Sequence, residues 1–102
     1  MAIQVVETSA LQSSGSGGPL MMPLAEAGQG RALLLNLEAG VSVAPCQMSV
    51  TVLYFVIAGQ GRLRVGEDHA ELKDGSLVVV PAGAVRSISA HQRMRVLAVQ
   101  IP

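Results

Sequence analysis

Two stretches of this chain decide its fold: G-V-S-V-A-P-C-Q-M-S-V-T-V-L-Y-F-V-I-A-G over residues 40–59, and G-S-L-V-V-V-P-A-G-A-V-R-S-I-S-A over residues 75–90. Both are rich in valine, and glycine begins or interrupts each of them. β-Branched residues favour strands, whereas glycine and proline permit the tight corners at which strands turn. These stretches therefore predict short strands joined at sharp corners.

The rest of the sequence repeats this pattern. Gly66-Glu67-Asp68 predicts a tight hairpin, and Gly59-Gln60-Gly61 predicts another corner. Short strands at such regular spacing indicate an all-β sandwich or barrel with antiparallel pairing. Helix is not favoured anywhere, and residues 24–32 are the mildest exception. We expect strands at residues 32–37, 49–57, 62–65, 69–72, 76–80, 85–89 and 94–101.

The chain has 102 residues, which is enough for one core and too few for two. We expect residues 1–19 to hold an N-terminal strand, near residues 3–6, and then a flexible Ser/Gly loop. Residues 20–102 are expected to form the barrel.

Composition disfavours several partners. Lys plus Arg and Asp plus Glu number seven each, so no net field would attract nucleic acid or an anionic membrane. Tyr54 and Phe55 are the aromatic residues of the sequence, which leaves no stacking platform for bases. One cysteine, the lack of a signal peptide and the lack of a long apolar run predict a cytoplasmic protein without a membrane span.

Two strand candidates are apolar on consecutive positions, at residues 77–80 and 96–99. A strand with one wet face alternates, so these strands predict a sheet that is covered on both faces. In a domain this small, a second subunit is the expected cover. We therefore predict a homodimer that buries sheet faces or edge strands.

The two glycine-punctuated stretches resemble the motifs of the cupin family, which are small, mostly bacterial jelly-roll barrels. The first family motif reads Gly, five residues, His, one, His, three or four, Glu, six, Gly, and the second reads Gly, five, Pro, one, Gly, two, His, three, Asn. The resemblance covers about the last two-thirds of the chain and implies an antiparallel jelly-roll (cupin) barrel. The matching positions are Gly40, Cys46, Met48, Val52 and Gly59, then Gly75, Pro81, Gly83, Arg86 and Ala90.

In this chain the frame of both motifs is kept, and the positions of the family's metal ligands hold other residues. Val52 has no donor atom, and Arg86 is permanently cationic and repels a metal ion. The resemblance therefore implies a metal-free cupin, and we expect no metal and no cofactor.

Arg86 is the substitution with the strongest chemical consequence, since the resemblance points it into the barrel, where a buried charge needs an anion. One interpretation is an ion pair with Glu26, Glu38 or Glu71, or escape of the side chain to solvent at the barrel mouth. The other is a fixed cation that clamps a ligand carboxylate or phosphate bidentately in place of the metal.

Cys46 and Met48 are two residues apart on a strand and so share a face. Core packing is the first interpretation; a redox-sensitive thiol and a two-sulfur copper(I) site are alternatives. His69 and His91 lie outside both motifs and are expected at solvated turns. The predicted ligand-binding residues are Arg86, Cys46, Met48, Val52 and Tyr54; no catalytic or metal residue is predicted.

Three functions remain open on the sequence. The first is a sensor or carrier that binds a small, mainly apolar ligand in the barrel. In one version of this prediction the ligand also carries an acid group. The second is a cupin-type enzyme, dioxygenase or isomerase-like, with non-standard ligands, although the inward motif positions hold no Glu, Asp or His to move protons. The third is a non-catalytic structural dimer with a solid core.

Overall fold

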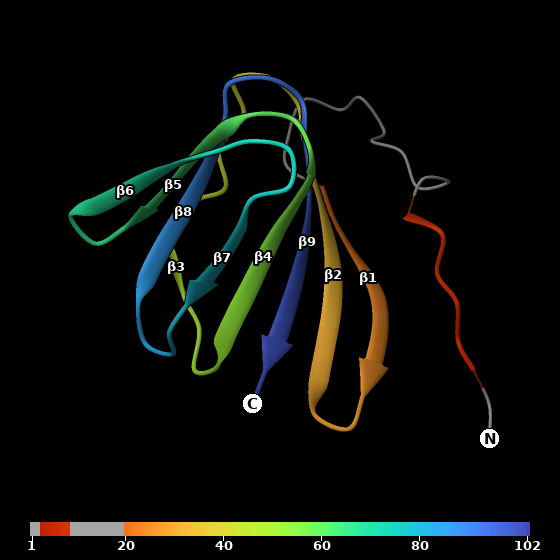
Figure 1. Ribbon diagram of the computed structural model, residues 1–102. Coiled ribbons are helices and arrows are strands. Elements are labelled where there is room, and N and C mark those ends of the chain that lie inside the picture. Colours follow the sequence, from red (N-terminus) through yellow and green to blue (C-terminus); the bar gives the residue numbers. More distant parts are fainter. Residues whose placement is uncertain (1–2, 9–19) are drawn as a thin grey trace.

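The computed structural model describes residues 3–8 and 20–102, and this part of the chain folds into two antiparallel sheets (Figure 1). A five-stranded sheet has the order β1-β2-β9-β4-β7, and a four-stranded sheet has the order β3-β8-β5-β6. The strands are β1 (Leu20–Ala27), β2 (Gly30–Leu37), β3 (Cys46–Gln47), β4 (Thr51–Ala58), β5 (Gly61–Val65), β6 (Asp68–Leu72), β7 (Leu77–Val80), β8 (Val85–Ala90) and β9 (Met94–Ile101).

The seven predicted strands are confirmed, with ends that shift by one or two residues. The mild helical exception at residues 24–32 is wrong, because β1 and β2 form a hairpin there around Gly28 and Gln29. The strand predicted at residues 3–6 is also wrong, since this segment is unpaired and lies beside β1, outside the two sheets. The Ser/Gly stretch predicted as a flexible loop falls outside the described residues.

The core lies between the two sheets. Along β4, Val52, Tyr54 and Val56 are buried, whereas the residues between them are more accessible, as expected for a strand with one face inward. Leu63 and Ile88, from the four-stranded sheet, pack into the same core cluster. The alternation of apolar residues thus fixes which face of each strand points into the roll.

The glycines of the two motif frames sit at chain corners. Gly40, Gly59, Gly75 and Gly83 all have positive φ, at 82°, 105°, 84° and 86°. Gly59 is also closely packed, because a Cβ atom there would lie 2.1 Å from the carbonyl oxygen of Arg93. The motif spacing is therefore a backbone requirement of this fold, independent of any metal.

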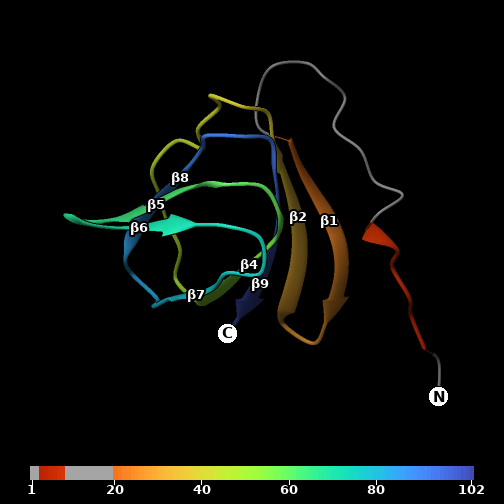
Figure 2. The ribbon, with the colours of Figure 1, turned by 45° about the horizontal axis from the view of Figure 1, so that its top comes forward.

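Figure 2 shows the β5–β6 hairpin extending away from the five-stranded sheet. Its turn is Gly66-Glu67, with Val65 paired to Asp68, which confirms the predicted tight hairpin. Within residues 3–8 and 20–102, no helix is long and apolar enough to cross a membrane.

Candidate functional site

Arg86 is a buried cation in the middle of β8. Its side chain is 2% exposed, although guanidinium groups rarely lose contact with water without an acidic partner. Nε donates to the carbonyl oxygen of Ala84 at 3.0 Å, and Nη1 donates to Tyr54 Oη at 3.3 Å. Nη2 is buried and has no hydrogen-bond partner. The guanidinium therefore carries an unused donor inside the protein.

The acidic residues considered as ion-pair partners of Arg86 bind elsewhere. Glu26 pairs with Arg31 at 3.3 Å, and Glu38 lies 3.8 Å from Arg93. Glu71 binds Arg62 and His91. The predicted internal ion pair of Arg86 is therefore wrong, and so is the predicted escape to solvent, since the side chain is buried.

Tyr54 carries the side-chain polar group that is hydrogen-bonded to this cation. Because Nη1 of Arg86 donates to Oη, the hydroxyl acts as an acceptor in that contact and keeps its own proton for another acceptor. No acceptor for this proton is found within residues 3–8 and 20–102. Arg86 Nη2 is thus a buried donor without a partner in the described part of the chain, and it belongs to the same guanidinium that contacts the Tyr54 hydroxyl.

The Tyr54 side chain also lines a cavity of about 90 Å³ inside the roll. Its wall is mainly apolar. Arg86 does not form part of this wall; it is hydrogen-bonded to Tyr54 and lines a separate pocket that also includes Arg64 and Ser87. Two of its lining residues, Met21 and Cys46, are exposed, and we take their side of the cavity as its mouth. The lining residues are Met21, Leu33, Leu35, Val43, Cys46, Met48, Val52, Tyr54, Ala98 and Gln100.

The structure brings four of the predicted site residues, Cys46, Met48, Val52 and Tyr54, to this one cavity. Arg86 is joined to it through Tyr54. Nε and one N–H of Nη1 are engaged by the protein, which leaves the second N–H of Nη1 and both N–H groups of Nη2, so the bidentate clamp on a ligand stays a prediction. Gln100, which adds an amide to the wall, was missed because nothing in its strand marks it.

Core packing of Cys46 is wrong, because its side chain is exposed. Cys46 pairs with Arg86 in register, so both side chains lie on the same side of the sheet. The reason for its exposure is that β3 is a two-residue strand at the edge of its sheet, with no further strand to cover it. Met48 follows β3, is half-buried and packs against the core.

The cupin motifs carry metal ligands in the family, and the residues at those positions of this chain do not fit a metal. Of the four positions, one is a guanidinium, one is valine, and the remaining two are Cys46 and Met48, whose side chains line the cavity. In the part of the chain that the structure describes, no three His, Cys, Asp or Glu side chains gather to hold an ion.

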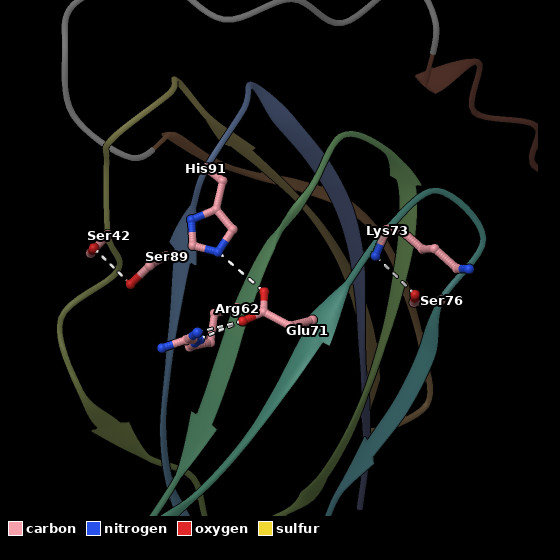
Figure 3. A network of polar contacts seen from close by, with 7 residues as sticks. All are labelled: Ser42, Arg62, Glu71, Lys73, Ser76, Ser89 and His91. Carbon is pink, nitrogen blue, oxygen red and sulfur yellow. Dashed lines mark hydrogen bonds and ion pairs between the residues drawn. The ribbon is translucent and has the colours of Figure 1, made fainter.

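A second polar cluster lies on the four-stranded sheet (Figure 3). Glu71 on β6 accepts from Arg62 Nε at 2.7 Å, and His91 Nε2 lies 3.1 Å from its other carboxylate oxygen. Arg62 first, and then His91, hold the pKa of Glu71 below its usual range. All three residues are exposed, so this is a solvated charge cluster built on the cross-strand pair of Arg62 and Glu71.

Among the residues that the structure describes, Asn36 is buried like Arg86; it was missed in the sequence, although it interrupts the apolar run of residues 33–37. Its side-chain oxygen accepts from Arg95 Nε at 3.3 Å, and its Nδ2 has no partner. Arg95 also donates to the carbonyl oxygen of Thr8. These contacts hold the described N-terminal segment against the five-stranded sheet, away from the cavity.

No family model matches the sequence, and no curated protein matches it. Several solved structures match the fold of this chain. A cupin superfamily protein from Desulfitobacterium hafniense DCB-2 is 20% identical, with a TM-score of 0.84 over 92% of this chain and 85% of that chain. An RmlC-like cupin protein from Desulfovibrio desulfuricans is 15% identical, with a TM-score of 0.89 over 99% of this chain and 98% of that chain.

The same fold occurs within larger proteins. Salicylate 1,2-dioxygenase from Pseudoaminobacter salicylatoxidans, as a W104Y mutant, matches 90% of this chain and 29% of its own length, at 16% identity and a TM-score of 0.76. At these identities the likenesses establish architecture. The protein therefore has the cupin fold, an antiparallel jelly-roll barrel.

Proposed function

We propose that this protein binds a small aliphatic carboxylate in its barrel, with the acid group at the Tyr54 hydroxyl and the Arg86 charge behind it. The observation that carries the proposal is the buried Arg86 guanidinium, whose Nη2 has no partner and which forms no ion pair among residues 3–8 and 20–102. A buried cation without a counter-ion is unfavourable, and an anionic ligand would relieve that cost.

The two free donors support a ligand that accepts hydrogen bonds. Tyr54 has a proton to give, and Arg86 stabilises negative charge on whatever accepts it. A neutral amide or alcohol would take the hydrogen bond but would gain nothing from the charge. The expected preference is therefore for a carboxylate over its uncharged analogues.

The cavity wall supports an apolar body for the same ligand. Leu35, Val52 and Ala98 provide aliphatic surface, and the cavity of about 90 Å³ is smaller than the ~150 Å³ site that accepts a benzene ring. A chain of roughly three to five carbons fits such a space. A longer chain would have to leave through the mouth beside Met21 and Cys46.

In this proposal the protein acts as a sensor or carrier in the cytoplasm, a compartment in which the exposed thiol of Cys46 stays reduced. The enzyme alternative ranks lower, because the four inward motif positions carry no residue suited to acid-base catalysis at neutral pH. The solid-core alternative is disfavoured by the cavity itself.

Thermal unfolding with a series of sodium carboxylates, from acetate to octanoate, tests the proposal. We expect the midpoint to rise most with the acids of intermediate length and to fall off for longer ones. A ligand at a hundred times its Kd adds about 2.7 kcal/mol to the free energy of unfolding, which is several degrees for a domain of this size.

Two variants make the test specific. Arg86→Met should abolish the stabilisation, and Arg64→Met should keep it, since Arg64 is an exposed arginine on the neighbouring strand β5. No response to any acid in the series, or an equal response of both variants, would refute the proposed function.

A further inference from the structure

Cys46 is an exposed thiol whose neighbour across the sheet is the buried cation Arg86. β3 pairs with the first two residues of β8, and Cys46 is the register partner of Arg86. Residues directly opposite in an antiparallel pair point to the same side of the sheet, with Cβ atoms about 5 Å apart. The side chains of Cys46 and Arg86 therefore leave the backbone at adjacent positions and on one side of the four-stranded sheet.

Two hydrogen bonds keep the Arg86 guanidinium near this position. Nε donates to the carbonyl oxygen of Ala84 at 3.0 Å, so the side chain stays at the end of β8 that pairs with β3. Nη1 donates to Tyr54 Oη, and Tyr54 lines the same cavity as Cys46. Nη2 is buried and has no partner among the described residues. The unused donor and the thiol are thus held in the same part of the roll.

The thiol differs from the guanidinium in being open to solvent. Cys46 is exposed because β3 is a two-residue strand at the edge of its sheet, whereas Arg86 is buried. Cysteines that react with oxidants are accessible and lie in electropositive surroundings, and Cys46 meets both conditions. It is also the single cysteine of the sequence, so an oxidised Cys46 finds no second thiol in its own chain with which to form a disulfide.

From these relationships we propose that Cys46 is an oxidation site for peroxides, and that its sulfinate pairs with Arg86 and excludes carboxylate ligands from the cavity. A sulfinate carries a negative charge at neutral pH and, like a carboxylate, has two oxygen atoms that accept hydrogen bonds. It would supply the acceptor that Nη2 lacks. The exclusion of ligands rests on the proposed function, whereas the pairing of Cys46 with Arg86 does not.

The oxidation takes two equivalents of peroxide. In the first step the thiolate attacks one peroxide oxygen, so that an S–O bond forms, the O–O bond breaks and sulfur loses two electrons. The departing oxygen takes up the proton that the thiol released, and the products are the sulfenic acid and water or an alcohol. A second peroxide reacts in the same way at the sulfur of the sulfenate and gives the sulfinate with another molecule of water or alcohol.

Treatment of the full chain with hydrogen peroxide is the first test. We expect peptide mass spectrometry to find two added oxygen atoms on the peptide that contains Cys46. Once the peroxide is removed, the oxidised protein should unfold at a higher temperature than the reduced protein and bind butyrate at least about tenfold more weakly. Cys46→Ser, treated in the same way, is the matched control. It should keep its unfolding temperature and its butyrate affinity, although its methionines are still open to oxidation.

Substitution tests the ion pair without peroxide and without ligand. Cys46→Asp places a carboxylate where the sulfinate would form, and Cys46→Asn is its neutral counterpart of nearly the same shape. With Arg86 present, Cys46→Asp should have a higher urea midpoint than Cys46→Asn. In the Arg86→Met background this advantage should disappear, because the carboxylate has lost its cation. Circular dichroism shows whether each variant is folded; if Cys46→Asp is not, oxidised wild type and oxidised Arg86→Met are compared instead.

An equal difference between the two Cys46 variants in both backgrounds would overturn the proposal. So would a Cys46 that peroxide leaves unmodified, an oxidised protein that binds butyrate as well as the reduced one, or a change of the same size in Cys46→Ser. If the reduced protein does not bind butyrate at all, the proposed function fails. The urea comparison then still decides whether Cys46 and Arg86 interact.

Discussion

Arg86 Nη1 donates a 3.3 Å hydrogen bond to Tyr54 Oη, between β8 of one sheet and β4 of the other. This contact spans the interior of the roll and ties the buried charge to the wall of the cavity. In this contact the Tyr54 oxygen is the acceptor, so the hydroxyl proton is left to donate. The geometry is suited to an anion.

Replacing Arg86 with Met should make the ligand-free protein more stable. The substitution removes a buried charge that has no acidic partner and puts an apolar side chain of similar length in its place. We expect a gain of about 1 to 3 kcal/mol in the free energy of unfolding, measured with urea. Arg64→Met should change it by less than about 0.5 kcal/mol. A large loss for Arg86→Met would mean that the guanidinium is structural.

Tyr54→Phe should weaken carboxylate binding and leave the fold intact. The ring still fills the core, and the variant loses the hydroxyl that donates to the ligand. A hydrogen bond to a charged acceptor contributes about 1.5 to 3 kcal/mol, so affinity for butyrate should fall roughly tenfold to a hundredfold in a fluorescence or calorimetric titration. An unchanged affinity would place the acid group away from Tyr54.

The Cys46 thiol should react in the native protein and be shielded by ligand. Cys46 is exposed and lies in the cavity wall, so a thiol reagent such as DTNB should modify it without denaturant. Saturating butyrate should slow the reaction several-fold, whereas the Arg86→Met variant should show no protection. If butyrate protects both proteins equally, the effect does not depend on the charged site.

Gly59→Ala should be strongly destabilising for reasons of backbone shape. The added methyl group would lie 2.1 Å from the carbonyl oxygen of Arg93, at a residue with φ of 105°. We expect a loss of more than about 3 kcal/mol in urea unfolding. Gly28→Ala is the control: φ is 61° and nothing lies within 4 Å of its Cβ position, so it should lose about 1 kcal/mol.

The contribution of Glu71 to stability should depend on pH. Its pKa is lowered in the folded protein by Arg62 and then by His91. The carboxylate therefore stabilises the fold at pH values above the ordinary glutamate pKa. This stabilisation is lost as the pH falls through the lowered pKa. We therefore measure the free energy of unfolding of the wild type and of Glu71→Gln between about pH 3 and pH 7. The two free energies should become equal at the acid end of this range. A gap that stays constant across this range would contradict the assignment.

Much of the fold was predictable because the motif glycines and the strand alternation record backbone shape directly. Gly59 and Gly83 have the positive φ that their spacing implied. β1 was missed because Pro23 and the small residues after it hide the strand pattern, and pairing with β2 includes a bulge next to Pro23. The secondary structure of such a segment is determined by its pairing with another strand, which the local sequence does not show.

The sequence allowed us to predict which residues form the candidate site. It did not allow us to predict how these residues contact one another. The motif frame placed Met48 and Val52 toward the interior, as the cavity wall shows. The sequence does not tell whether Arg86 meets a carboxylate, because the chain carries seven acidic residues and their positions depend on tertiary packing. Likewise, Cys46 is exposed because β3 is short and lies at a sheet edge, which follows from the topology.

The most direct measurement is calorimetric titration of the wild-type protein with butyrate and with butyramide, its uncharged analogue of nearly equal size. If the Arg86 guanidinium binds an anion, butyrate should bind and butyramide should bind at least about tenfold more weakly. This is the difference in affinity expected when a charge-assisted hydrogen bond is lost. Equal affinities, or binding of the amide alone, would contradict the claim that the Arg86 charge selects the ligand.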